Sequence, residues 1–140
     1  MLFDFELVFK AISVPARIRV LKLLSKYELC VCQIVAVLGL SQSTVSKHLW
    51  ILKSARLIQD RKDGRWVFYS LVQNSRNEYV QFFISNLSKW LEDDEIVTED
   101  LKRMEIIKKT PLEEIRECSS KILSGLSCER IKTNEGGAKQ

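Results

Sequence analysis

Apolar residues recur at helical spacing through the first half of the chain, which predicts a series of short amphipathic helices. The first of these covers residues 3–12. The second begins at Pro15, because proline lacks the N–H that the start of a helix would leave unpaired. Three basic residues of the second helix are expected to lie in solvent: Arg17, Arg19 and Lys22.

A tight helical pair follows. The third helix is predicted from about Val31 to Leu38 and ends at Gly39, because glycine readily takes the left-handed conformation that ends a helix. Ser41 is the predicted N-cap of a fourth helix that runs to about Ser54. Two helices joined by so short a glycine-containing turn form a helix-turn-helix.

After the fourth helix the pattern changes from helical spacing to alternation. Val67, Tyr69 and Leu71 alternate with more polar neighbours, and Asp63-Gly64 is a typical hairpin turn signal. The pattern predicts a two-stranded β-ribbon with basic residues at its tip. The expected fold is therefore mainly α with a small β-hairpin, a winged helix-turn-helix.

The remaining residues predict further helices and a polar tail. Ser75 with Glu78 forms a capping-box pattern that opens a fifth helix. Its predicted apolar stripe is Tyr79, Phe82, Phe83, Leu87, Trp90 and Leu91. We expect a sixth helix near residues 101–107 and a seventh beginning at Pro111. The predicted domains are residues 1–95 for the winged helix-turn-helix, 96–126 for a helical extension and 127–140 for a disordered tail.

The fourth helix has the composition of a DNA-reading helix. At about 100° per residue, Val45, Leu49 and Leu52 face inward, while Ser43, Lys47 and Trp50 face outward. Short hydroxyl, amide and amino side chains can bond base edges and phosphates in the major groove. The candidate DNA-binding residues, including the ribbon tip, are Ser41, Gln42, Ser43, Thr44, Ser46, Lys47, His48, Arg61, Lys62 and Arg65.

Composition and charge restrict the class of protein but do not identify its function. The chain has 140 residues, a formal net charge of +4 and 46% hydrophobic residues, which suits a globular domain and permits a polyanionic partner. No apolar run reaches the roughly 18 residues of a membrane span, and acidic residues stand where a signal peptide would be basic. We therefore expect a cytoplasmic protein without a membrane partner, whose thiols are reduced.

Two of the four cysteines are candidate metal ligands. Cys30 and Cys32 lie at the mouth of the third helix, where a regular helix would point them about 200° apart. Both sulfurs could then hold one ion only if that turn were extended or unwound. We therefore expect ion capture to distort the start of the helix-turn-helix. Thiolates favour As(III), Sb(III), Cd(II), Pb(II) or Cu(I) over Mg(II) or Mn(II).

A family resemblance supports this interpretation. The stretch from Glu28 to Ile34, Glu-Leu-Cys-Val-Cys-Gln-Ile, together with Leu40-Ser-Gln-Ser-Thr-Val-Ser-Lys-His-Leu49, resembles the arsenical-resistance repressors of the ArsR/SmtB type. Residues 57–71 resemble that family's wing, and the similarity covers roughly residues 5–92. The resemblance implies a homodimer, formed through the first and fifth helices and bound to a palindromic operator. It also favours As(III) or Sb(III) as the inducer.

The chain departs from the family pattern in its ligands. Arsenic-responsive members often have a third cysteine at the position of Val35. A third thiolate would then come from Cys118 or Cys128, or only two thiolates would bind. The family's zinc site on the fifth helix needs histidines, and His48 is the only histidine in the chain, so that site is not expected.

Other functions fit less well. A redox or sulfide-responsive regulator of the same fold would use the same cysteines through disulfide or persulfide chemistry. An enzyme is not expected, because there is no Cys-X-X-Cys within a βαβ pattern and no nucleotide-binding glycine loop. A winged-helix adaptor that binds only proteins would associate with DNA weakly and without salt dependence.

Overall fold

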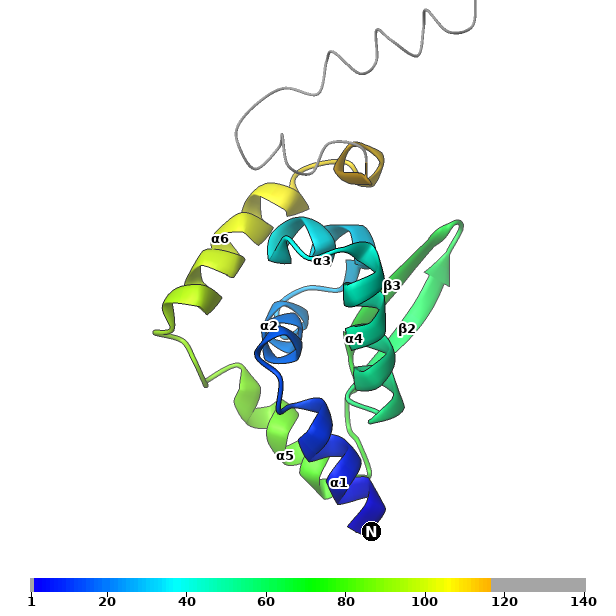
Figure 1. Ribbon diagram of the computed structural model, residues 1–140, viewed down its shortest axis with the longest axis vertical. Coiled ribbons are helices and arrows are strands. Elements are labelled where there is room, and N and C mark those ends of the chain that lie inside the picture. The colour runs from blue at the N-terminus through cyan, green and yellow to red at the C-terminus, as the bar shows by residue number, and fades with distance from the viewer. Residues whose placement is uncertain (1, 117–140) are drawn as a thin grey trace, which may run out of the picture.

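The computed structural model of the protein describes residues 2–116. The elements are α1 (Leu2–Ala11), α2 (Pro15–Leu24), β1 (Leu29–Cys30), α3 (Val31–Leu38), α4 (Gln42–Ser54), β2 (Ile58–Asp63), β3 (Trp66–Leu71), α5 (Glu78–Leu87) and α6 (Glu95–Lys108). Residues 112–116 are also helical. This mainly helical architecture with one β-hairpin confirms the predicted fold class (Figure 1). Within the described part, no helix is long and apolar enough to cross a bilayer.

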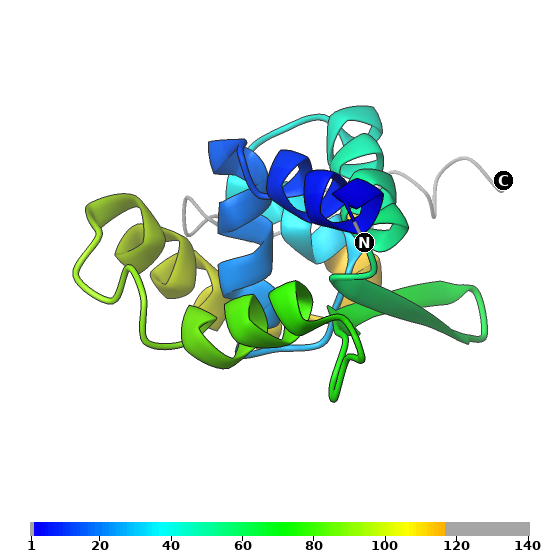
Figure 2. The same cartoon turned by 90° about the horizontal axis from the view of Figure 1, so that it is seen from below.

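The sheet has three antiparallel strands in the order β1-β3-β2. Strands β2 and β3 form the hairpin that projects from the helical body (Figure 2), and Gly64 in its turn has a left-handed φ of 59°. The predicted two-stranded ribbon is confirmed, but the prediction missed the third strand, β1. The two-residue strand β1 pairs Leu29 with Tyr69 and Cys30 with Phe68, and so short a strand has no alternation to reveal it.

Helix α2 lies between the other helices, and its apolar face contributes to one shared core (Figure 1). That core draws on α3, α4 and α6 as well, so residues beyond 95 pack with the helix-turn-helix. Representative core residues are Leu21, Leu23, Ile34, Val37, Leu49, Leu52, Met104 and Ile107. Burial of this apolar area is the main term that stabilises the fold.

The prediction that Lys22 lies in solvent is wrong, because its side chain is almost completely buried. Its ammonium group donates hydrogen bonds to the carbonyl oxygens of Leu87 at 3.0 Å and Trp90 at 2.7 Å. The last carbonyls of a helix have no partner within it, and a cation is favoured at this negative end of the helix dipole. Lys22 therefore ties α2 to the end of α5.

Arg19 is also not a solvated residue. Its guanidinium donates two hydrogen bonds of 2.8 Å to the carboxylate of Asp100, which is buried on α6. Such a bidentate pair is geometrically specific, and loss of one partner would leave a poorly solvated charge. The pair fixes α6 against α2.

Helix α5 begins two residues later than predicted. Asn77, not Ser75, is the N-cap, and its side-chain oxygen accepts hydrogen bonds from the backbone N–H groups of Tyr79 and Val80. The hydroxyl of Ser75 instead accepts the Asn77 N–H in the preceding turn. The helix ends at Leu87, so Trp90 and Leu91 lie outside it.

Candidate nucleic-acid interface and dithiol site

Helix α4 presents the two faces that its sequence predicts. Val45, Leu49 and Leu52 are buried in the core. On the opposite side, residues from Ser41 to Lys47 other than Val45 are exposed. The exposed N-terminal half of α4 therefore carries a row of short polar side chains and one lysine toward solvent.

The connection between α3 and α4 confirms the predicted tight turn. Gly39 has a left-handed φ of 69°, and its N–H donates to the carbonyl of Val35 at 2.9 Å. Ser41 caps α4 by accepting the Thr44 N–H at 3.2 Å, and its hydroxyl donates to the Thr44 hydroxyl at 2.8 Å. The helix-turn-helix is thus closed by local hydrogen bonds.

His48 lies at the edge of the predicted DNA-binding face and is half-buried. Its Nδ1 is 3.5 Å from the guanidinium of Arg17, which also donates to the carbonyls of Lys10 and Ala11 at the end of α1. Burial lowers the pKa of His48, and the charges of Arg17 and Lys47 lower it further. The imidazole is therefore neutral at pH 7, and Arg17 connects α4 to α1.

The basic side chains of the hairpin are exposed, and two of them pair with carboxylates. Arg61 donates to Glu28 at 2.6 Å, and Arg65 donates to Glu113 at 2.6 Å. Each guanidinium also lies over an aromatic ring of β3, Phe68 for Arg61 and Trp66 for Arg65. Exposed pairs of this kind are weak, so phosphate groups can replace these carboxylates.

Cys30 and Cys32 are close together without any unwinding of α3. Cys30 is the N-cap residue, with the extended backbone angles φ −88° and ψ 166°, so only Cys32 is within the helix. Their Sγ atoms are 2.7 Å apart. The turn is extended at Cys30, one of the two arrangements predicted to let both sulfurs hold one ion, so the 200° separation of two helical residues does not arise.

The side chain of Gln33 stabilises the extended backbone at Cys30. This role of Gln33 was not predicted from the sequence. Its side-chain oxygen accepts the N–H of Cys30 at 3.0 Å, which is the reciprocal half of a capping box. The signal was present, since Gln33 lies three residues after Cys30, but cysteine stands where the motif has serine or threonine. The same residue Cys30 ends β1 and pairs with Phe68 of the hairpin.

The two thiols differ in acidity. A hydrogen bond from Cys32 lowers the pKa of Cys30 to about 7, against the effect of burial, and backbone N–H groups of the first turn lower it further. The pKa of Cys32 is raised, because its thiol donates that hydrogen bond and is itself half-buried. Cys30 therefore ionises before Cys32, and around neutral pH the pair passes from two thiols to one thiolate beside one thiol.

Comparisons with known proteins show which family the chain belongs to. Residues 14–60 match the profile of "Bacterial regulatory protein, arsR family". An arsenic resistance transcriptional regulator of Pseudomonas putida is 36% identical over 91 residues, which cover 62% of this chain and 79% of that protein. The chain belongs to the ArsR family. Because members of this family are regulatory proteins, this also confirms that the chain is not an enzyme.

One further relative and one solved structure extend the comparison. A transcriptional repressor SmtB homolog of Synechocystis is 46% identical over 66 residues, 47% of this chain and 50% of that protein, so the match spans half of the relative. The homodimeric winged helix-turn-helix DNA-binding domain of a Mycobacterium bovis protein has a TM-score of 0.53 and 27% identity, covering 63% of this chain and 78% of that one. The winged helix-turn-helix architecture of this ArsR-family chain is thereby confirmed.

A second candidate surface of this ArsR-family protein is apolar. Rings of α1 and α5 contact one another, with centroids 4.3 Å apart for Phe5 and Phe9 and 4.9 Å for Phe5 and Tyr79. Beside them Phe82 is largely exposed and Trp90 is partly exposed. We call these side chains, with the groove of about 570 Å³ that they border, the α1–α5 surface.

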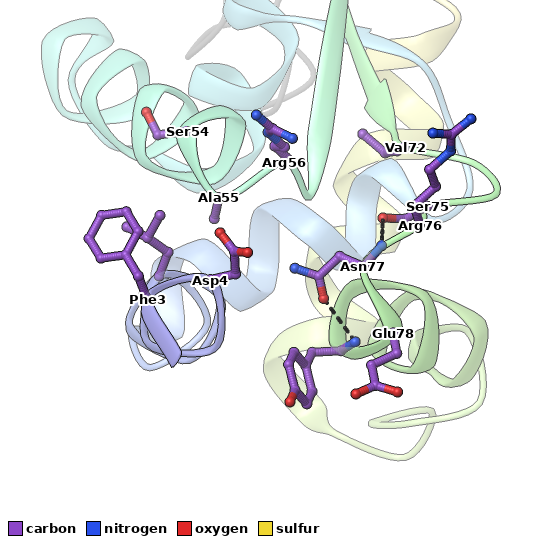
Figure 3. Close-up of a pocket in the computed structure, with 12 residues that line it drawn as sticks. Phe3, Asp4, Ser54, Ala55, Arg56, Val72, Ser75, Arg76, Asn77 and Glu78 are labelled. Atoms are coloured by element: carbon purple, nitrogen blue, oxygen red, sulfur yellow. Dashed lines mark hydrogen bonds between the residues drawn. The ribbon is translucent and has the colours of Figure 1, made fainter. Parts of the chain in front are cut away.

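A larger cavity of about 790 Å³ lies between α1, the end of α4 and the loop before α5 (Figure 3). Arg56 and Arg76 line it together with Asp4 and Glu78, so its charges are mixed. Among residues 2–116, none of the predicted DNA-binding residues and neither Cys30 nor Cys32 lines this cavity. Cys118, the predicted third ligand, and Cys128 lie outside the described residues.

The acidity of Cys30 gives a testable pH dependence. In a chain with Cys118 and Cys128 replaced by serine, Cys32→Ala removes the hydrogen bond that stabilises the thiolate. The pKa of Cys30 should then rise from about 7 toward the ordinary value of about 8.5. Thiolate ultraviolet absorbance measured against pH reports the midpoint. Cys32→Ser keeps an O–H donor and is the control, and an unchanged midpoint in Cys32→Ala would contradict the assignment.

Proposed function

We propose that this ArsR-family protein is a homodimeric transcriptional repressor that leaves its operator when a soft ion binds Cys30 and Cys32. The observation that carries the proposal is the position of this dithiol. It lies where β1, which pairs with the hairpin, meets α3, which packs against α4. An ion held there acts on both elements that would contact DNA.

DNA binding is assigned to α4 and to the β2–β3 hairpin. The exposed side chains of Gln42, Ser43, Ser46 and Lys47 suit the major groove, and Thr44 and Ser41 suit phosphates near the helix start. Arg61, Lys62 and Arg65 lie on the projecting hairpin, where they would reach the flanking backbone (Figure 2). His48 is better placed to connect α4 with Arg17 than to contact a base.

The α1–α5 surface is the proposed dimer interface. Aromatic side chains exposed together on one face exceed what a soluble monomer normally leaves uncovered. A second copy covers the same surface on both protomers, as two-fold symmetry requires. The homodimeric state of the Mycobacterium bovis domain supports this assignment.

The ligand is proposed to be As(III) or Sb(III), with Cd(II), Pb(II) or Cu(I) as the next soft candidates. Two sulfurs that each lie about 2.3 Å from one ion are about 3.8 Å apart when the ion is tetrahedral and about 3.5 Å apart when it is pyramidal, as As(III) is. The observed separation is 2.7 Å, so the sulfurs need to move apart by only about 1 Å. Among residues 2–116 no third histidine, cysteine or carboxylate completes a ligand group, so a third thiolate would come from Cys118 or Cys128.

This movement gives a route to derepression. Parting the sulfurs shifts Cys30 in β1 against Cys32 in α3, and thereby shifts the hairpin against the helix-turn-helix. The ion then needs to favour the altered arrangement by only a few kcal/mol to empty the operator. No unwinding of α3 is required.

Operator release in the presence of different ions tests the proposal. The probe is a fluorescent duplex of the DNA immediately upstream of the gene, with binding followed by anisotropy. Arsenite and antimonite should release it at low concentrations, while Mg(II) and Mn(II) should not. Tight binding that no soft ion relieves would overturn the sensing role, and the absence of any DNA binding would overturn the repressor.

A redox-responsive regulator is the second candidate, and the low pKa of Cys30 beside a second thiol favours it. A peroxide would take two electrons from the pair, both thiols would lose their protons, and one S–S bond would form. Release by hydrogen peroxide that dithiothreitol reverses, without release by arsenite, would support this candidate over the first.

Lys47 provides the test of the groove assignment. Lys47→Ala should weaken operator binding by about 1–3 kcal/mol per half-site and reduce the salt dependence of binding, because one cation leaves the interface. Lys102→Ala on α6 removes the same charge elsewhere and serves as the matched control. Equal operator affinities of the two variants in anisotropy titrations would count against α4 as the reading helix.

A further inference from the structure

Trp50 is an indole on the outward face of α4, with 67% of its surface exposed. Residues three or four apart share one side of a helix, so Trp50 continues the row that runs from Ser43 through Lys47. The other exposed side chains near it on this helix are Ser46, Lys47, Lys53 and Ser54. An apolar ring therefore lies in a polar and basic surface.

These surroundings distinguish Trp50 from the exposed aromatic residues of the α1–α5 surface. There, Phe82 and Phe83 lie with their ring centroids 6.2 and 5.7 Å from Trp90, and the rings form a contiguous patch suited to another protein surface. Trp50 has serines and lysines as neighbours instead. A surface that is cationic and polar with one apolar projection matches a polyanion that itself carries isolated apolar groups.

Duplex DNA has such a group in its major groove. The 5-methyl of thymine is the apolar feature among the base edges, and side chains that recognise thymine do so by apolar contact. Trp50 lies eight residues beyond Gln42, about 12 Å along the helix axis. That is comparable with the roughly 12 Å width of the groove, and the long indole side chain can reach inward from there.

We propose that Trp50 contacts a thymine methyl group in each half-site and thereby selects thymine at that position. The inference rests on the proposed binding of DNA by α4 and adds a base preference to it. The polar residues of the row have no apolar group of comparable size, and on the hairpin the rings of Phe68 and Trp66 lie beneath the guanidinium groups of Arg61 and Arg65.

Replacement of thymine by deoxyuridine, which lacks only the methyl group, gives the test. Each thymine of the upstream duplex is replaced in turn, symmetrically in both half-sites, and the anisotropy titration is repeated. At one position the natural protein should lose about fourfold in affinity per half-site, as expected for one buried methyl group. Trp50→Ala should bind the thymine and uracil duplexes equally, whereas Ile106→Ala, an exposed apolar control on α6, should discriminate like the natural protein.

The salt dependence separates this result from a failure of the proposed function. Because indole carries no charge, Trp50→Ala should keep the salt slope of the natural protein, whereas Lys47→Ala should reduce it. Retained discrimination by Trp50→Ala, or no uracil effect at any position, would overturn the thymine contact while leaving DNA binding by α4 in place. A natural protein that binds none of the duplexes would overturn the repressor function itself.

Discussion

Replacing Cys30 and Cys32 together with serine is expected to leave operator binding within roughly twofold of the natural protein, yet to abolish release by arsenite. Serine is a favoured N-cap residue, so the start of α3 should persist. Its hydroxyl is a poor ligand for soft ions. The arsenite concentration needed for release should rise by roughly two orders of magnitude or more, since each 1.4 kcal/mol of lost coupling is a factor of ten.

The matched control is the Cys118→Ser/Cys128→Ser variant, which keeps the dithiol at α3. It should still release the operator, more weakly if one of these cysteines supplies a third thiolate. Anisotropy titrations with arsenite on the same duplex compare the two variants. Full release from the Cys30→Ser/Cys32→Ser variant would place the sensor elsewhere in the chain.

Phe82→Asp is expected to convert the dimer to a monomer and to weaken operator binding by roughly 10²–10⁴-fold. Phe82 is 66% exposed on the α1–α5 surface, and a carboxylate there would be buried without a partner when two copies associate. A monomer loses the second half-site contact, which the dimer makes at high effective concentration. Sedimentation equilibrium measures the first effect, and anisotropy measures the second.

Ile96→Asp is the control for this change, because Ile96 is 58% exposed on α6 and does not line the groove of the α1–α5 surface. It should remain dimeric and bind the operator normally. A dimeric Phe82→Asp variant would show that the protomers associate through another surface. A monomeric variant with undiminished operator affinity would show that dimerisation does not contribute to DNA binding.

Local patterns predicted the helix-turn-helix well. The Gly39 turn, the Ser41 cap and the inward face of α4 all depend on residues within a few positions of one another. The apolar stripe predicted around α5 is only partly buried: Phe82 is 66% and Trp90 40% exposed, whereas Phe83 packs against the core.

Features that depend on distant partners were predicted poorly. Lys22 reads as a surface residue, but its acceptors lie more than sixty positions away at the end of α5. Arg19 likewise meets Asp100 across the fold. The strand β1 was missed because two residues carry no periodicity, and only pairing with β3 defines it.

The sequence by itself determined the order of the helices and the hairpin, the polar outward face of α4 and the presence of two thiols near the start of α3. These follow from periodicity and capping, which are properties of short segments. Only the tertiary structure decided how the thiols meet. Pairing with β3 keeps Cys30 extended, and Gln33 holds its N–H, so both sulfurs lie together at the junction of the hairpin and the helix-turn-helix. That outcome required contacts between segments nearly forty residues apart, which no local pattern encodes.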